Sequence, residues 1–141
     1  MIRKASAVWR GDLKGGKGTF SLNSGLLKDA PYSFSTRFED APGTNPEELI
    51  AAAHAACFSM ALSAQLGGMG ITPQSVSTAA TLTLEKTDAG FTITEIHLDT
   101  VAKIPGGDKA KFEQAANNAK AGCPVSRVLN AKISLTARLE S

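Results

Sequence analysis

Short runs of alternating apolar and polar residues fill the first third of the chain. The first run begins at Ala5, the second covers 19–22 and the third covers 32–38. Glycines at 15–18 are expected to turn the chain between the first two runs. Such alternation predicts β-strands. The residues that the third run places on one face are Tyr32, Phe34, Thr36 and Phe38.

A helix is predicted from residue 46 to about residue 66. Asn45 suits the N-cap, Pro46 suits the first helical position, and Glu48 has the capping-box spacing from Asn45. Both acids of the first turn, Glu47 and Glu48, favour the positive end of the helix dipole. The helix is expected to stop at the glycines 67–68.

This predicted helix is apolar nearly all round, because most of its residues are alanine. A helix of this kind is normally enclosed on every side, and one chain of 141 residues has few elements with which to enclose it. We therefore predict a homodimer that shares the helix core. The apolar stretch 49–66 contains His54 and Gln65 and falls short of the roughly 20 strongly apolar residues of a membrane span, so no membrane partner is expected.

The second half of the chain is expected to mix strands and helices. Two strands meet at the turn 88–90, and the apolar face changes phase between Phe91–Ile93 and Ile96–Leu98, which indicates a β-bulge. Helices are predicted at 108–121, with Gly122 as the C-cap, and at 124–129. The apolar positions of the first are Phe112, Ala115, Ala116 and Ala119. A last strand alternates over 131–139. Strands, then helices, then strands again predict an α+β fold.

Length and composition fit a single domain covering 1–141. Hydrophobic residues make up 43% of the chain and aromatic residues only 6%, so the core is expected to be mainly aliphatic. The net charge of +2 and the scattered Lys and Arg argue against nucleic-acid binding. The first residues lead directly into alternating sequence and do not resemble a secretory signal. The expected compartment is the cytoplasm, where structural disulfides are disfavoured.

The segment 11–18 (GDLKGGKG) nearly matches a phosphate-binding loop. Gly18 stands where a Ser or Thr hydroxyl would be needed, and a predicted strand follows where a helix N-terminus would be needed. We therefore interpret the segment as a hairpin turn.

The two cysteines, Cys57 and Cys123, have different local settings. Cys57 lies inside the apolar helix, where a cysteine is usually a small buried hydrophobe. Cys123 directly precedes Pro124 at a predicted helix N-terminus, so local chemistry alone makes Cys123 the more acidic thiol. From the residues alone, inert thiols and a working pair both stay open.

The two histidines give weaker functional signals than the cysteines. His54 precedes Cys57 by three residues and shares its helical face. It is either a base that makes the thiolate or, as we favour, a histidine packed at an interface, because a neutral pair gains little thiolate character. His97 has no evident partner, and the His and Cys spacing does not predict a zinc site.

Several segments, in order along essentially the whole chain, resemble the osmotically inducible protein C and organic hydroperoxide resistance (OsmC/Ohr) family. The two long cysteine motifs carry the resemblance: 44–62 (TNPEELIAAAHAACFSMAL) and 121–126 (AGCPVS). The segments 9–18 (WRGDLKGGKG), 34–39 (FSTRFE) and 87–91 (TDAGF) are similar to the OsmC branch in particular.

The resemblance implies an intertwined homodimer whose long central helices are wrapped by mostly antiparallel sheets. It implies a peroxidase of oxidative or osmotic stress defence that uses no metal, haem or flavin. By matched position, Cys57 is the peroxidatic cysteine and Cys123 the resolving cysteine. Arg37, on the strand before the helix, and Glu47 match the charged pair that supports the reactive thiol. His54 stands where Ohr proteins commonly have Tyr, which argues against an obligatory proton-transfer role.

The implied chemistry reduces an organic hydroperoxide to an alcohol through Cys57 sulfenic acid and a Cys57–Cys123 disulfide. A small external dithiol, of lipoyl type or another, would restore the thiols. Glu47 and Cys57 are ten residues apart, about 15 Å along a straight helix. If both serve one site, Glu47 is predicted to come from the partner subunit, whereas the chain that supplies Arg37 stays open.

Two other functions compete with a peroxidase. The same fold could bind small hydrophobic ligands without catalysis, or form a stress-protective dimer whose cysteines only sense oxidation. A binder has no need of Cys123 beside Cys57, so the second cysteine favours the enzyme.

Overall fold

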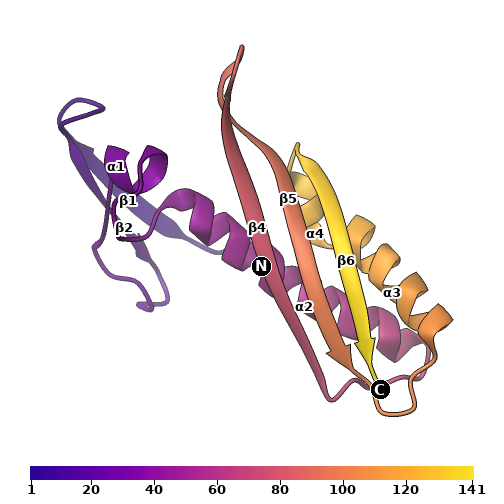
Figure 1. Cartoon of the computed structure of the whole chain (residues 1–141). Helices are drawn as coiled ribbons and strands as arrows, with labels where there is room; N and C mark the ends of the chain where they lie inside the picture. Colours follow the sequence, from indigo (N-terminus) through magenta and orange to yellow (C-terminus); the bar gives the residue numbers. More distant parts are fainter. The chain divides into compact units, whose positions relative to one another are not determined.

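Strand β1 (Ala5–Arg10) pairs antiparallel with β2 (Lys17–Leu22), which pairs antiparallel with β3 (Ala30–Ser33). The helix α1 (Phe34–Phe38) follows directly. The computed structural model describes residues 1–141, and these elements belong to the first of two compact units, Met1–Leu49 and Ile50–Ser141 (Figure 1). The assignment of 1–141 as one domain stays a prediction.

The turn between β1 and β2 confirms that 11–18 contains a hairpin. Arg10 pairs with Lys17, so the turn covers 11–16 and β2 begins two residues earlier than expected. Asp12 stabilises the turn because its carboxylate accepts hydrogen bonds from the backbone N–H groups of Lys14 and Gly15, at 3.0 and 2.8 Å. These hydrogen bonds lower the pKa of Asp12.

The predicted strand over 32–38 is wrong beyond Ser33, where α1 begins. Ser33 caps this helix: its hydroxyl accepts from the Thr36 N–H, and its own N–H donates to the Thr36 hydroxyl. Phe34 and Phe38 are four residues apart, so they fit a helical face as well as a strand face, and their ring centroids lie 4.9 Å apart. Arg37 consequently lies on a short helix and not on a strand.

Helix α2 (Pro46–Gly68) begins and ends close to the predicted bounds. The Asn45 side chain accepts from the Glu48 N–H at 2.8 Å, which confirms Asn45 as the N-cap. Every fourth residue is buried, and this stripe consists of His54, Phe58, Leu62 and Leu66.

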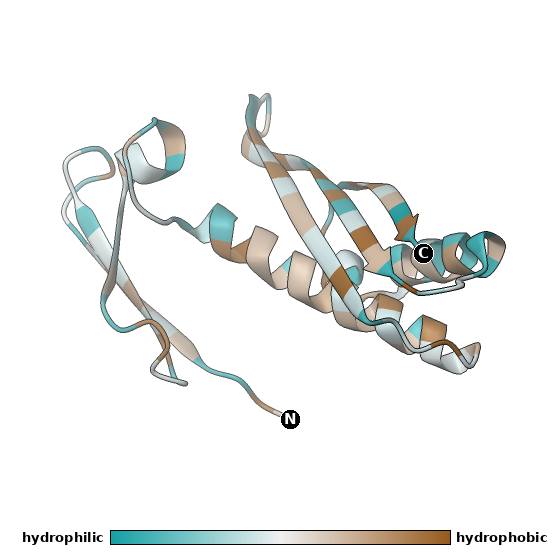
Figure 2. Ribbon diagram, turned by 60° about the horizontal axis from the view of Figure 1, so that its bottom comes forward, coloured by the Kyte–Doolittle hydropathy of each residue, from teal (hydrophilic) through white to brown (hydrophobic).

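The rest of α2 is not enclosed by its own chain. Five apolar residues on it are exposed: Ala52, Ala53, Ala56, Met60 and Ala64. Hydrophobic and near-neutral colours predominate along α2 after its first turn (Figure 2). By length and hydropathy alone α2 could span a membrane, a test that core helices of water-soluble proteins also pass. The second copy that would cover this face stays a prediction.

The second sheet has the order β4–β5–β6. Strand β4 (Ser75–Thr87) is antiparallel to β5 (Gly90–Lys103), and β5 is parallel to β6 (Lys132–Glu140). The predicted bulge is confirmed: Thr83 pairs with Glu95 and Leu84 with Ile93, which leaves Thr94 outside the register.

Helix α3 (Lys109–Gly122) and α2 cover one face of this sheet (Figure 1). The core between them contains Phe58, Leu62 and Leu66 from α2, Ile96, Leu98 and Ala102 from β5, and Phe112, Ala115, Ala116 and Ala119 from α3. The predicted apolar face of α3 is therefore confirmed. Its C-cap is Cys123 and not Gly122, which is the last helical residue. Helix α4 (Pro124–Val128) follows at once.

Candidate functional site

The two cysteines lie in contact within the second unit. Cys57 comes from the middle of α2 and Cys123 from the junction of α3 and α4, and their sulfur atoms are 2.7 Å apart. Both are free thiols; Cys57 is partly exposed and Cys123 is buried. A disulfide bond is about 2.05 Å long, so only a small movement separates the pair from a bond.

Backbone geometry at the helix junction holds Cys123 in place. Its N–H donates to the Ala119 carbonyl at 2.9 Å, at the C-terminal end of α3. Its carbonyl accepts from the Arg127 N–H at 3.0 Å, at the N-terminal end of α4. Pro124 has no N–H and disfavours a helical conformation at the residue before it, so α3 ends there. Cys123 lies outside the helical region, with φ −55° and ψ 126°.

Burial raises the pKa of the Cys57 thiol, and the neighbouring Cys123 thiol raises it further. A hydrogen bond from the backbone N–H of Val125, in the first turn of α4, acts in the opposite direction and lowers this pKa. We expected the start of this helix to act on Cys123. It acts on Cys57, because the chain folds the first turn of α4 onto α2.

His54 lies fully buried one turn before Cys57. Its Nε2 is 2.7 Å from the Ser126 hydroxyl of α4, and its Nδ1 has no hydrogen-bond partner. Burial lowers the pKa of His54, so the ring is neutral at pH 7. This agrees with the interpretation of His54 as a packed histidine. Its hydrogen-bond partner, Ser126, belongs to α4 of the same chain. The sequence did not predict this contact.

Arg37 and Glu47 form an ion pair within the first unit. Arg37 Nη2 donates to Glu47 Oε1 at 2.5 Å, and Arg37 Nε donates to both carboxylate oxygens at 3.2 Å. Glu47 is only 12% exposed and Arg37 is 33% exposed. The hydrogen bond to Glu47 raises the pKa of Arg37, so the guanidinium is a permanent, fixed cation.

His97 has partners, contrary to expectation. Its Nδ1 lies 2.7 Å from the Ser134 hydroxyl and its Nε2 lies 3.1 Å from the Thr136 hydroxyl, both on β6. The parallel pairing of β5 with β6 brings these residues together, and local sequence does not reveal it. No group of three or more His, Cys, Asp or Glu side chains is arranged to hold a metal ion.

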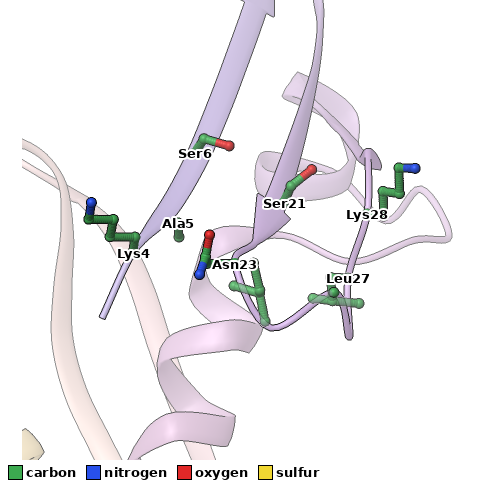
Figure 3. Close-up of a pocket in the computed structure, with 9 residues that line it drawn as sticks. Lys4, Ala5, Ser6, Ser21, Asn23, Leu27 and Lys28 are labelled. Carbon is green, nitrogen blue, oxygen red and sulfur yellow. The ribbon is translucent and has the colours of Figure 1, made fainter. Parts of the chain in front are cut away.

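The cavities of the first unit include two with different linings. One, of about 480 Å³, lies beside β1 and β2, and Lys4, Ser6, Ser21, Asn23 and Lys28 are among the residues around it (Figure 3). The other, of about 230 Å³, is lined by aromatic side chains and by Arg37. The sequence reasoning predicted neither of them.

Known proteins resemble the chain over nearly its whole length. The family described as OsmC-like protein matches residues 38–138. Peroxiredoxin OsmC of Escherichia coli is 56% identical over 139 residues, which cover 99% of this chain and 97% of that protein. The organic hydroperoxide resistance protein of Xanthomonas axonopodis pv. citri is 30% identical over 89% of this chain and 88% of its own length.

The fold of the chain is similar to that of a solved structure. The organic hydroperoxide resistance protein OhrB of Bacillus subtilis has a TM-score of 0.68 and 26% identity, covering 97% of this chain and 98% of that one. The α+β fold predicted from the sequence is thereby confirmed. The chain belongs to the OsmC-like protein family.

Proposed function

We propose that this chain is a cysteine-based peroxidase that reduces organic hydroperoxides to alcohols in oxidative or osmotic stress defence. The observation that carries the proposal is the 2.7 Å separation of two sulfur atoms that are 66 residues apart in sequence. The printed names of the relatives, a peroxiredoxin and organic hydroperoxide resistance proteins, support the same chemistry.

In the proposed reaction the Cys57 thiolate attacks the distal oxygen of R–O–O–H. The O–O bond breaks, Cys57 becomes a sulfenic acid, and the leaving alkoxide takes a proton to become the alcohol. The Cys123 sulfur then attacks the Cys57 sulfur, which forms the disulfide and releases water. A small external dithiol, of lipoyl type or another, reduces the disulfide by thiol exchange. The cycle needs no metal or organic cofactor.

Thiolate formation needs a positive charge beside Cys57, because burial and Cys123 both raise its pKa. Arg37 can supply this charge, and Glu47 fixes its guanidinium. Glu47 and Cys57 are both in α2, and ten residues of helix span about 15 Å. We therefore propose that the Arg37–Glu47 pair of one chain serves the cysteines of its partner in a homodimer.

Turnover measurements test the proposal and separate an enzyme from a sensor or a binder. Reduced protein with cumyl hydroperoxide and excess dihydrolipoamide is expected to release cumyl alcohol over many cycles. Cys57→Ser should abolish release. Cys123→Ser should release one equivalent of alcohol and then leave a sulfenic acid that dimedone traps. If alcohol release by the wild-type protein stops after one equivalent although the dithiol is present, this would contradict enzymatic turnover.

A further inference from the structure

A single amide side chain joins the end of α1 to the start of α2. The Asn45 Nδ2 donates to the Thr36 carbonyl at 2.7 Å, and the Asn45 Oδ1 accepts from the Glu48 N–H at 2.8 Å. The last carbonyls of a helix and the first N–H groups of a helix have no partner within the helix itself. Asn45 therefore satisfies one group of each kind, and all of these atoms belong to the first unit, Met1–Leu49.

The Arg37–Glu47 ion pair connects the same two helices. Arg37 directly follows Thr36 in α1, and Glu47 directly precedes Glu48 in α2. The amide bridge and the ion pair are thus neighbouring connections. A helix of five residues is too short to be stable by itself, so the orientation of α1 depends on contacts of this kind.

The loop between the two helices passes close to Thr36. A Cβ at Gly43 would lie 3.2 Å from Thr36 Cγ2, and Gly43 has a φ of 136°, which residues other than glycine rarely adopt. Thr36 is also held within α1, because its hydroxyl donates to the Ser33 carbonyl at 3.1 Å. The Thr36 carbonyl is therefore a fixed acceptor for the Asn45 amide.

The side chain of Arg37 needs a second constraint besides its ion pair. It is 33% exposed, and an ion pair near the surface holds a long side chain only weakly. We propose that Asn45 is a positioning residue, which keeps α1 and α2 in the arrangement that holds the guanidinium of Arg37 against Glu47. The consequence for Cys57 rests on the proposed function, whereas the effect on Arg37 itself does not.

Asn45→Ser separates the bridge from the helix cap. Serine is as good an N-cap as asparagine, so α2 should still begin at residue 46, but the shorter side chain cannot span the Glu48 N–H and the Thr36 carbonyl. Asn45→Thr is a second neutral variant that keeps a cap and lacks the amide. Asp108→Ala is the matched control, because it removes the N-cap of α3 and leaves the bridge between α1 and α2 intact.

Hydrogen exchange of the Arg37 Nε–H reports how firmly the guanidinium is held, because this group donates to both oxygens of Glu47. The signal is followed by NMR of the reduced, full-length protein and assigned by its loss in Arg37→Lys. Both Asn45 variants should exchange this proton about three- to tenfold faster than the wild type, the effect of one lost hydrogen bond. Asp108→Ala should not change the rate. An unchanged rate in both Asn45 variants would overturn the proposal.

Alkylation by iodoacetamide extends the test to the thiol. In a Cys123→Ser protein only Cys57 can react, and the midpoint of its pH profile should rise by about one unit in Asn45→Ser, a part of the one to three units of a close opposite charge. When Arg37→Ala is already present, Asn45→Ser should add nothing, because no guanidinium remains to be positioned. An equal rise with and without Arg37 would mean that Asn45 acts by another route, and the proposal would be wrong.

The two measurements distinguish this proposal from the proposed function, since neither uses a peroxide. Faster exchange in Asn45→Ser, together with an unmoved midpoint in Arg37→Ala, would support the positioning by Asn45 and reject the role of Arg37 at Cys57. A moved midpoint in Arg37→Ala, together with no effect of Asn45→Ser on exchange or midpoint, would keep that role and reject the positioning.

Discussion

Two opposite effects act on the thiol of Cys57. Burial and the Cys123 thiol raise its pKa, whereas the Val125 N–H lowers it. The thiolate and not the thiol attacks a peroxide, so this balance sets the pH range of the proposed reaction. Since the net effect within the second unit is a raised pKa, the proposed reaction at neutral pH requires a nearby cation, the role that we propose for Arg37.

The pH profile of the reaction tests this dependence on Arg37. In the wild-type protein kcat/KM for cumyl hydroperoxide is expected to rise with pH as Cys57 loses its proton. Arg37→Ala should move this rise to higher pH by about one to three units, the effect of one close opposite charge. Arg37→Lys keeps the charge and should move it less. An unchanged midpoint in Arg37→Ala would exclude Arg37 as the stabilising cation.

His54 links stability to pH with a definite sign. Its pKa is lowered by burial in the folded state, so the unfolded chain binds a proton more readily below its ordinary pKa of about 6.5. Stability is therefore complete above that pH and falls as the pH drops below it, by at most about 1.4 kcal/mol per pH unit for one proton. His54→Gln should flatten this part of the urea unfolding free-energy curve. Equal slopes in both proteins would contradict the assignment.

Helix α4 makes several contacts at the candidate site although it has only five residues. It begins at Cys123, its first turn donates the Val125 N–H to Cys57, and Ser126 bonds to His54 of α2. The hydrogen bond of Ser126 to a buried side chain fixes α4 against α2. It therefore helps to hold the two sulfur atoms together.

Ser126→Ala removes this bond and should slow closure of the Cys57–Cys123 disulfide about fivefold, which corresponds to about 1 kcal/mol for one hydrogen bond. The rate of alcohol release in a single turnover should not change. Rapid quenching with dimedone measures the trapped Cys57 sulfenic acid, whose fraction should be larger than in the wild-type protein. Ser126→Thr keeps a hydroxyl and should restore closure; failure of this rescue, or unchanged trapping in Ser126→Ala, would contradict the role of the bond.

Elements with strong local signals were predictable from the sequence, and contacts between distant segments were not. Asn45, Pro46 and the glycines at 67–68 define α2 because caps act locally. The helix α1 was missed because Phe34 and Phe38 fit both periodicities, and the capping contact between Ser33 and Thr36 decided the outcome. The Val125 contact with Cys57 and the parallel pairing of β5 with β6 depend on tertiary folding, which no local pattern encodes.

At the scale of the whole molecule, the candidate site residues fall into two groups. Arg37 and Glu47 are paired in the first unit, and Cys57 and Cys123 in the second. The exposed apolar face of α2, which includes Ala56 and the 77% exposed Met60, is the surface that we expect a second copy to cover. In the proposed dimer, each complete site combines one group from each chain.

A mixed dimer tests this exchange between chains. One chain has Cys57→Ser and the other has Arg37→Ala, each with a different affinity tag so that only the heterodimer is purified. If the groups come from different chains, one complete site forms. About half of the wild-type activity then returns at neutral pH, where the Cys57→Ser homodimer is inactive and the Arg37→Ala homodimer has lost most of its activity. If both groups come from one chain, the heterodimer has no complete site, and an activity no higher than that of the Arg37→Ala homodimer would contradict the proposal.

The most direct measurement of the central claim is a single oxidation of the fully reduced protein with one equivalent of cumyl hydroperoxide per chain. Mass spectrometry of the intact chain should show the loss of two hydrogen atoms, and peptide mapping should join Cys57 to Cys123. One equivalent of cumyl alcohol per chain should appear no later than the disulfide. Unchanged thiols, or a disulfide formed without release of the alcohol, would contradict peroxide reduction by this pair of cysteines.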